Sequence, residues 1–388
     1  MSKLEELIQE FCPNGVEFKA IKEEYQRLKG TPITASKMKE IQSDSGDIRI
    51  FAGGKTVIDA HEKDIPNANI TRVPAVLVQS RGVIDAVYYE RPFTFKNEMW
   101  AYTHKEKTSV KYLYYVLKNN IERFREAASG MGSLPQISLR VTEDFVMPLP
   151  PLPVQREIVR ILDSFTELTA ELTAELTARR KQYEYYTNIL LSFDKKTPSV
   201  QLRNISDFRN GKGHEKDIVA DGKYIVVNSK FISTSGEVKK YSNKQICPLY
   251  TDDIVMVMSD LPNGRALAKC FVVEENDKYS LNQRIGAFHV KDKNIITTKF
   301  LYYVLNRNRQ LLRYDNGVDQ TNLRKDDILD IQIPLPSISE QKRIVTILDR
   351  FDTLCNDLTS GLPAEIEARQ KQYEYYRDKL LTFRELEV

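Results

Sequence analysis

Apolar residues recur at steps of three and four along two long stretches of the chain. The first stretch follows a proline-rich segment and runs from Ile158 to Leu190, and the second runs from Ile344 to Leu380. Such steps predict a hydrophobic stripe on one face of a helix, and stripes of this length are typical of coiled coils. We expect the second helix to be interrupted at 360–363, SGLP, because glycine can end a helix and proline suits the first turn of the next. The residues expected to pack the helix pair are Ile158, Phe165, Leu168, Leu172, Leu176, Tyr183, Tyr186, Ile344, Phe351, Leu354, Tyr373 and Tyr376.

Two further blocks, residues 16–148 and 198–333, have a different pattern. Short β-rich runs, such as Ala75–Gln79 in the first block and Asp253–Met258 in the second, lie between glycine-containing turn signals. Amphipathic stretches with helical spacing follow these runs in both blocks. The pattern predicts two compact mixed α/β domains.

The sequence contains an internal repeat that covers most of the chain. The segment PLPPLPVQREIVRILDSF at 148–165 returns as PLPSISEQKRIVTILDRF at 334–351, 186 residues later, and KQYEYY at 181–186 returns at 371–376, 190 residues later. Such matches indicate a tandem duplication in which each copy is a variable block followed by a helix. The predicted division is an N-terminal helix at 1–15, a first domain at 16–148, a first spacer helix at 149–197, a second domain at 198–333 and a second spacer helix at 334–388.

Charge follows the same division. The whole chain of 388 residues carries a net charge of only +3. Residues 16–148 hold 20 basic and 17 acidic residues, a net of +3, and residues 198–333 hold 21 and 17, a net of +4, whereas the remainder is negative. Positive charge in two separate blocks is expected where two surfaces meet a polyanion such as DNA.

The composition, 41% hydrophobic and 29% charged, is typical of a soluble protein. No stretch reaches the roughly 18 apolar residues that a membrane span needs, so we expect a cytoplasmic protein with no membrane contact. The four cysteines, Cys12, Cys247, Cys270 and Cys355, are scattered without a CxxC pair. We therefore expect free thiols and no zinc site.

The sequence matches none of three catalytic or phosphate-binding motifs completely. The run GGKT at 53–56 ends like a phosphate-binding loop, but the required glycine is replaced by Arg49, so a hairpin turn is the better interpretation. No Asn/Asp-Pro-Pro-aromatic sequence of an adenine methyltransferase is present, and the Glu17–Lys19 pair lacks the upstream residues of a nuclease site. The sequence predicts neither catalytic nor metal-ligating residues.

The duplicated order of variable block and helix, the P-L-P-x-x-x-x-Q-x-x-I-V-x-I-L-D-x-F entry to each helix, and the A-R-x-K-Q-Y-E-Y-Y run at 178–186 and 368–376 resemble the specificity subunits of type I restriction-modification enzymes. The resemblance covers essentially the whole chain. It implies an α+β fold with two target-recognition domains separated by two long antiparallel coiled-coil helices, related by a pseudo-two-fold internal repeat.

The same resemblance implies a function and partners. Each domain would read one half of a split site in double-stranded DNA, and the helices would hold the domains apart and bind two methyltransferase subunits. A restriction subunit with motor and nuclease activity would complete the complex. S-adenosylmethionine, ATP and Mg²⁺ would be carried by those partners, with no cofactor in this chain.

Candidate DNA contacts are polar side chains that follow predicted strands, since arginine and the amide side chains match the hydrogen-bonding edges of bases. A solvated turn is the alternative for each. The candidates for base contact are Gln79, Ser80, Arg81, Asn263, Arg265, Asn282, Gln283, Arg284, Gln320 and Asn322. Those for phosphate contact are Lys29, Lys55, Lys212 and Lys230. The tyrosines of KQYEYY could stack on bases, but their spacing on an apolar stripe favours helix packing.

Two other functions compete with this one. A coiled-coil scaffold joining two protein-binding modules would explain the helices but not the segregated positive charge, and a nuclease or methyltransferase acting alone would need motifs that the sequence lacks.

One further feature of the first long helix is the repeat ELTA-ELTA-ELTA at 167–178. One tetrad adds ~6 Å of helix and a net ~40° of rotation, close to the twist of one DNA base pair. The repeat therefore predicts a ruler that sets the spacer between the two half-sites.

Overall fold

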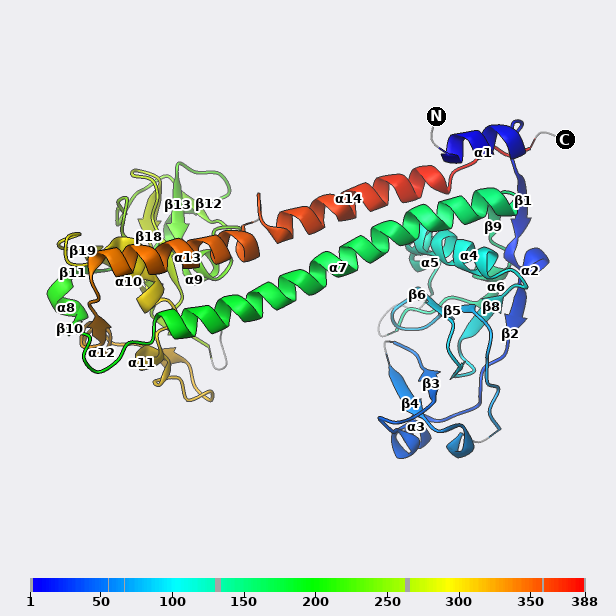
Figure 1. Cartoon of the computed structure of the whole chain (residues 1–388), viewed down its shortest axis with the longest axis horizontal. Helices are drawn as coiled ribbons and strands as arrows, with labels where there is room; N and C mark the ends of the chain where they lie inside the picture. The colour runs from blue at the N-terminus through cyan, green and yellow to red at the C-terminus, as the bar shows by residue number, and fades with distance from the viewer. Residues whose placement is uncertain are drawn as a thin grey trace. The chain divides into compact units, whose positions relative to one another are not determined.

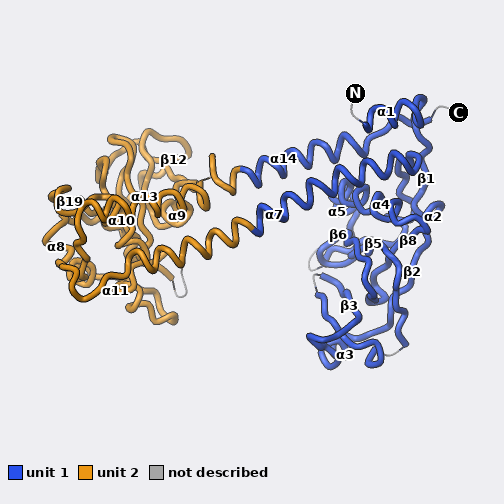
Figure 2. The backbone as a smooth tube through the Cα atoms, in the orientation of Figure 1, with its two compact units in different colours: residues 1–174, 365–388 blue, residues 175–364 orange. Residues whose placement is uncertain are grey.

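The computed structural model describes residues 3–54, 56–65, 67–129, 134–261, 266–357 and 359–386. The chain forms two compact units, one made of residues 1–174 and 365–388 and the other of residues 175–364 (Figure 2). Each unit contains one variable domain and a part of both spacer-helix regions. The units therefore cut through the spacer helices, whereas the sequence-based division falls at their ends.

The first domain consists of two small sheets (Figure 1). The larger sheet has the order β2-β8-β5-β6 and the smaller one the order β4-β3-β7, in which β3 and β7 are parallel. A separate antiparallel pair, β1-β9, joins the start of the domain to its end. The strands are β1 Glu17–Ala20, β2 Gln26–Leu28, β3 Ile48–Phe51, β4 Val57–Ala60, β5 Ala75–Gln79, β6 Asp85–Tyr89, β7 Phe93–Phe95, β8 Trp100–Thr103 and β9 Val146–Leu149.

Short helices cover these sheets. The amphipathic helix α4 packs on β5 and β6 and buries one face in the main core of the unit. The smaller sheet has its own core, to which α3 contributes Met38 and Ile41. The helices of this part are α1 Lys3–Phe11, α2 Ile21–Glu24, α3 Ala35–Ile41, the 3₁₀ turn η1 Glu62–Asp64, α4 Lys107–Asn119, α5 Ile121–Glu126 and α6 Leu139–Glu143.

The second domain repeats this plan. Its sheets have the orders β11-β19-β15-β17 and β12-β14-β13-β18, with β13 and β18 parallel, and β10-β21 is the counterpart of β1-β9. Its strands are β10 Ser199–Gln201, β11 Ser206–Asn210, β12 Ile218–Val219, β13 Tyr224–Val227, β14 Tyr241–Ser242, β15 Ile254–Val257, β16 Ser259–Asp260, β17 Cys270–Val272, β18 Tyr279–Leu281, β19 Ile285–Val290, β20 Thr321–Asn322 and β21 Gln332–Pro334. Its helices are α8 Leu202–Ile205, the 3₁₀ turn η2 Glu215–Asp217, α9 Ser229–Ser233, α10 Thr298–Leu305, α11 Arg309–Leu312 and α12 Lys325–Leu329.

The first spacer forms one helix, α7 Leu152–Leu190, of 39 residues. The second spacer forms α13 Ile338–Asn356 and α14 Leu362–Leu380, so the helix is interrupted before Leu362 and Pro363 lies in the first turn of α14. A side chain at Gly361 would place its Cβ 2.4 Å from the Thr353 carbonyl oxygen, which explains why glycine lies at this interruption. The prediction of mixed α/β domains joined to long helices is confirmed.

In both units the helices pack through matched contacts. Phe165 of α7 stacks on Tyr376 of α14 in the first unit, and Phe351 of α13 stacks on Tyr186 of α7 in the second. In the second unit, residues later in α7 contact residues earlier in α13. Arg180 donates to the Cys355 carbonyl oxygen, and Tyr183, further along α7, stacks on Phe351, which comes before Cys355. The two helices are therefore antiparallel there.

The burial of the expected packing residues is uneven. Ile158, Leu176 and Ile344 are buried, whereas Tyr186 and Tyr376 remain 38% and 41% exposed. The half-buried members are Phe165, Leu168, Leu172, Tyr183, Phe351, Leu354 and Tyr373.

A second matched contact fixes each domain to its spacer helix. The hydroxyl of Tyr115 donates to the Asp163 carboxylate at 2.5 Å, and that of Tyr303 donates to the Asp349 carboxylate at 2.6 Å. Burial raises the pKa of both tyrosine hydroxyls, so each remains a protonated donor. Within the described ranges no helix combines the length and the hydropathy of a membrane span.

Candidate nucleic-acid interface

Five loop segments meet on one side of the first domain. The backbone of Lys96 forms an isolated β-bridge with that of Thr31, and the Lys96 backbone N–H donates to the Phe51 carbonyl oxygen at 3.0 Å. The Ser80 hydroxyl donates to the Glu98 carbonyl oxygen at 2.6 Å, and Arg81 forms a bridge with Gln136. These contacts gather the segments 29–31, 52–54, 80–82, 96–98 and 134–136, which we call the first polar edge.

The second domain gathers the equivalent segments. Lys212 forms a bridge with Asn282, and the backbone N–H of Asn282 donates to Val227 at 3.1 Å. Ser259 of β16 pairs with Asn322 of β20. We call the segments 210–212, 228–230, 258–260, 282–284 and 320–322 the second polar edge.

Two bridges show that the edges correspond position by position. The bridge between Thr31 and Lys96 matches that between Lys212 and Asn282. A glycine precedes the first member of each pair, and at Gly211 a Cβ would approach the Asn282 carbonyl oxygen to 1.8 Å. Only glycine permits so close an approach of two backbone segments, so this residue fixes where the two loops meet.

The second shared bridge carries different side chains in the two domains. Arg81 is opposite Gln136 in the first domain, and Ser259 is opposite Asn322 in the second. The backbone bonds around them match, because Ile137 donates to the Ser80 carbonyl oxygen at 3.0 Å and Leu323 donates to that of Met258 at 2.8 Å. The scaffold is thus repeated, while the side chains that it presents are not.

The structure separates the expected residues 79–81 of the first domain. Arg81 is exposed on the first polar edge. Gln79 and Ser80 are only 6% and 0% exposed, and the Ser80 hydroxyl is used inside the protein. We correct the prediction for these two residues, because side chains buried beneath the loop cannot reach a DNA groove in this structure.

The expected lysines lie where phosphates could be reached. Lys29 and Lys212 are exposed at corresponding ends of β2 and β11, and Lys230 is exposed on α9. Three expected residues, Lys55, Asn263 and Arg265, lie outside the described residues.

A buried histidine links two segments of the second edge. The ring Nδ1 of His214, which is 1% exposed, lies 2.7 Å from the Lys212 carbonyl oxygen and 3.3 Å from Asn282 Oδ1, and its Nε2 lies 2.8 Å from the Ser280 hydroxyl. The Gln283 amide donates to the Glu215 carboxylate at 2.5 Å. Arg284 is exposed and has a positive φ of 65°, a strained conformation that turns the loop.

Sequence reasoning left part of the first edge open and missed another part. The run SLPQ at 133–136, which ends at Gln136, could be either a DNA-facing loop or a turn, and the segment Lys96–Glu98 was not expected. Their position in the fold, matching Asn322 and the segment 282–284, is the only indication. Lys96 forms an ion pair with Glu98 at 2.9 Å, which offsets the negative charge there.

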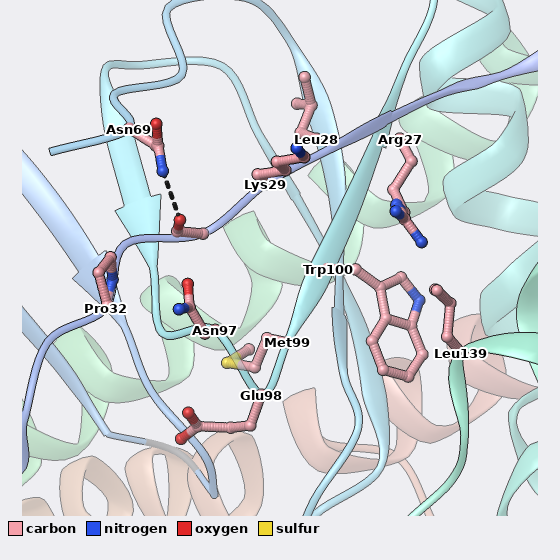
Figure 3. Close-up of a pocket in the computed structure, with 11 residues that line it drawn as sticks. Arg27, Leu28, Lys29, Pro32, Asn69, Asn97, Glu98, Met99, Trp100 and Leu139 are labelled. Carbon is pink, nitrogen blue, oxygen red and sulfur yellow. Dashed lines mark hydrogen bonds between the residues drawn. The ribbon is translucent and has the colours of Figure 1, made fainter.

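A pocket of about 680 Å³ opens beside the first edge (Figure 3). Asn69 on its wall donates to the Gly30 carbonyl oxygen at 2.7 Å, and the indole N–H of Trp100 donates to the Thr142 hydroxyl at 2.9 Å. Its polar lining residues are Arg27, Lys29, Asn69, Asn97 and Glu98. The mixture of donors with one paired carboxylate suits polar contact with a nucleic acid more than metal binding. In the described part of the chain no three His, Cys, Asp or Glu side chains are grouped as metal ligands would be.

Comparison with known proteins gives consistent matches. The family model described as "Type I restriction modification DNA specificity domain" matches residues 14–179 and 195–368. The specificity subunit of the Escherichia coli type I restriction enzyme EcoR124I/EcoR124II is 36% identical over 305 residues, covering 71% of this chain and 72% of that protein. A putative type I specificity subunit of Haemophilus influenzae is 32% identical over 311 residues, covering 74% and 77%.

Two solved structures share the fold. The S subunit of a type I restriction-modification system from M. genitalium superposes with a TM-score of 0.62 at 16% identity, covering 95% of this chain and 96% of that one. A chain from a structure of the type I restriction-modification system superposes with a TM-score of 0.56 at 15% identity, covering 95% and 98%.

Proposed function

This chain belongs to the family of type I restriction-modification DNA specificity domains, and on that premise we propose that its two polar edges each read one half of a bipartite DNA site. The chain is a specificity subunit, and its role in the complex is DNA recognition without catalysis. The proposal assigns this role to particular surfaces, the first polar edge for one half-site and the second for the other.

The observation that supports the proposal is the repeated scaffold with unequal side chains. Matching backbone bridges place Arg81 and Gln136 in one domain where Ser259 and Asn322 stand in the other. Equal scaffolds can approach two DNA segments in the same way, and unequal hydrogen-bonding groups then read different bases. The two half-sites should consequently differ in sequence.

Phosphate contacts would orient each domain before its bases are read. Lys212 and Lys230 are exposed on the second edge, and Lys29 is exposed on the first. Lysine contacts with phosphates carry no sequence information but release counterions, so affinity should fall steeply with salt. A protein-binding scaffold would lack this dependence on salt when tested with DNA.

We further propose that the helices bind two methyltransferase subunits, each through an equivalent surface. Tyr185 and Tyr375 occupy the same place in the two KQYEYY runs and are 60% and 62% exposed. Aromatic side chains that are exposed on a helix are favoured at protein interfaces. Replacing Tyr375 alone with serine should reduce the bound methyltransferase from two copies to one, measured by the mass of the complex. Retention of both copies would argue against this surface.

The chemistry of the complex would reside in those partners. S-adenosylmethionine would be bound by the methyltransferase subunits, and ATP with Mg²⁺ by a restriction subunit that contains the motor and the nuclease. The contribution of this chain would be to select the DNA and to position the partners on it.

Exchange of one domain tests the modular function. Residues 16–148 would be replaced by the corresponding block of a relative, and methylated sites would be mapped in cells that express the chimaera with the methyltransferase. We expect one half-site to change and the other to remain. Replacing residues 198–333 instead should change the opposite half-site, and a change in both halves from either exchange would refute the assignment.

A further inference from the structure

Three polar side chains form a closed network on the second polar edge. The Gln320 amide donates to the Ser259 hydroxyl at 2.8 Å and to Asn322 Oδ1 at 3.3 Å. The Ser259 hydroxyl in turn donates to Asn322 Oδ1 at 2.7 Å. Ser259 and Asn322 are 63 residues apart in the sequence and are brought together by the pairing of β16 with β20.

This network orients the Asn322 amide. An amide oxygen has two lone pairs, and both are used here, one by Ser259 and one by Gln320. The amide nitrogen of Asn322 then points away from the network on an exposed residue, and it forms no hydrogen bond with the described part of the chain. Asn322 therefore offers a donor with a fixed direction.

The neighbouring residue Asp260 stabilises this arrangement. Its carboxylate accepts hydrogen bonds from the backbone N–H groups of Leu261, Ala266 and Leu267 at 2.9, 2.7 and 3.1 Å. These bonds fix the end of β16 on which Ser259 is carried. A donor held on a rigid element discriminates between bases better than one on a mobile side chain, because less rotational freedom is lost on binding.

We propose that Asn322 is a specificity-determining residue that donates through Nδ2 to an acceptor on a base edge, with Ser259 and Gln320 as its positioning residues. The acceptors available in the major groove are guanine O6 and N7, adenine N7 and thymine O4, whereas cytosine offers only a donor there. Because the oxygen of Asn322 is already engaged, the two-bond pairing of asparagine with adenine is not available to it. This inference rests on the proposed function of the second polar edge.

The Asn322→Asp variant tests the direction of this hydrogen bond. The carboxylate keeps the shape of the amide and still accepts from Ser259 and Gln320, but the outward nitrogen becomes an acceptor. Binding would be measured with oligonucleotides that vary each base of the half-site read by the second domain. We expect discrimination of about 5- to 150-fold at one base position to be lost or reversed toward a base that presents a donor, cytosine or adenine.

Three further measurements make the test decisive. Ser259→Ala should weaken discrimination at the same position only, and less than Asn322→Asp does. The half-site read by the first domain is the internal control and should not change in either variant, and thermal unfolding should show that both variants fold.

The possible failures are distinguishable. An Asn322→Asp variant that keeps its original base preference would overturn the inference, even if its affinity falls equally for all sequences, because the added negative charge is repelled by the phosphates of any DNA. If the domain exchange succeeds while Asn322→Asp changes nothing, only this inference fails. If the exchange fails, the proposed function fails with it.

Discussion

Phe165 stacks on Tyr376 with ring centroids 5.5 Å apart and an angle of 23° between the ring planes. The two residues belong to different copies of the internal repeat. Their counterparts, Phe351 and Tyr186, form the same stack in the other unit at 5.4 Å and 25°. Each copy thus supplies the phenylalanine of one stack and the tyrosine of the other, so both copies are needed to form either stack.

This exchange of aromatic residues predicts a local loss of stability. Phe165→Ala should destabilise the first unit by about 1–3 kcal/mol, because the ring is half-buried and loses both apolar contact and its stacking partner. Thermal unfolding followed by circular dichroism would measure the loss. Phe351→Ala is the matched variant in the second unit, and Phe165→Leu should recover part of the stability. No change in Phe165→Ala would show that the stack is incidental.

Two basic side chains on the polar edges should have different roles. Arg81→Ala should relax preference at one base position at a cost of about 1–3 kcal/mol, because arginine can bind a guanine edge through two hydrogen bonds. Lys230→Ala should instead weaken all sequences nearly equally and reduce the salt dependence. Competition binding with single-base variants at several salt concentrations separates the two outcomes. Uniform weakening from Arg81→Ala would reassign it as a phosphate contact.

Loss of the Asp260 carboxylate should affect both stability and specificity of the second domain. Its three backbone hydrogen bonds join Leu261 to residues 266–267, on the two sides of the segment that contains Asn263 and Arg265. Asp260→Ala should lower the unfolding free energy by about 1–3 kcal/mol, since the donors lose a charged partner, and should reduce discrimination in one half-site.

The control for Asp260→Ala is Glu275→Ala. Glu275 forms an exposed ion pair with Lys278, and removing such a pair should cost less than about 1 kcal/mol. If Asp260→Ala reduces discrimination in both DNA half-sites, the variant has a general binding defect, and the local role of Asp260 in the second domain is contradicted.

The ELTA repeat predicts a change in spacer length. Residues 167–178 lie within α7, with Leu168 and Leu172 half-buried and Leu176 buried. Deleting one tetrad shortens the helix by ~6 Å and turns it by a net ~40°, while the leucines stay on the same stripe. We expect the unread spacer to shorten by one base pair with both half-sites unchanged. Mapping methylated sites of the deletion variant provides the measurement, and an unchanged spacer with full activity would exclude the ruler.

The sequence by itself determined the parts of this protein that depend on neighbouring residues. Helical periodicity placed α7, glycine and proline placed the break before α14, and the alternation of apolar runs and turns placed β5 over Ala75–Gln79 as found. The repeat of PLP-entry and KQYEYY motifs identified the duplication and the family. The helix face and the buried strand follow from the sequence because each is specified by residues a few positions apart.

The tertiary structure alone decided which polar loops act together. The sequence left open whether the loop that ends at Gln136 is a DNA-facing loop or a turn, and the structure pairs Gln136 with Arg81. Asn322 likewise meets Ser259 across 63 residues of chain. Gln79 and Ser80 looked equivalent to Arg81 in sequence, but they are buried and Arg81 is exposed. The register between distant strands sets these outcomes, because a shift of one residue moves a side chain to the opposite face of a strand.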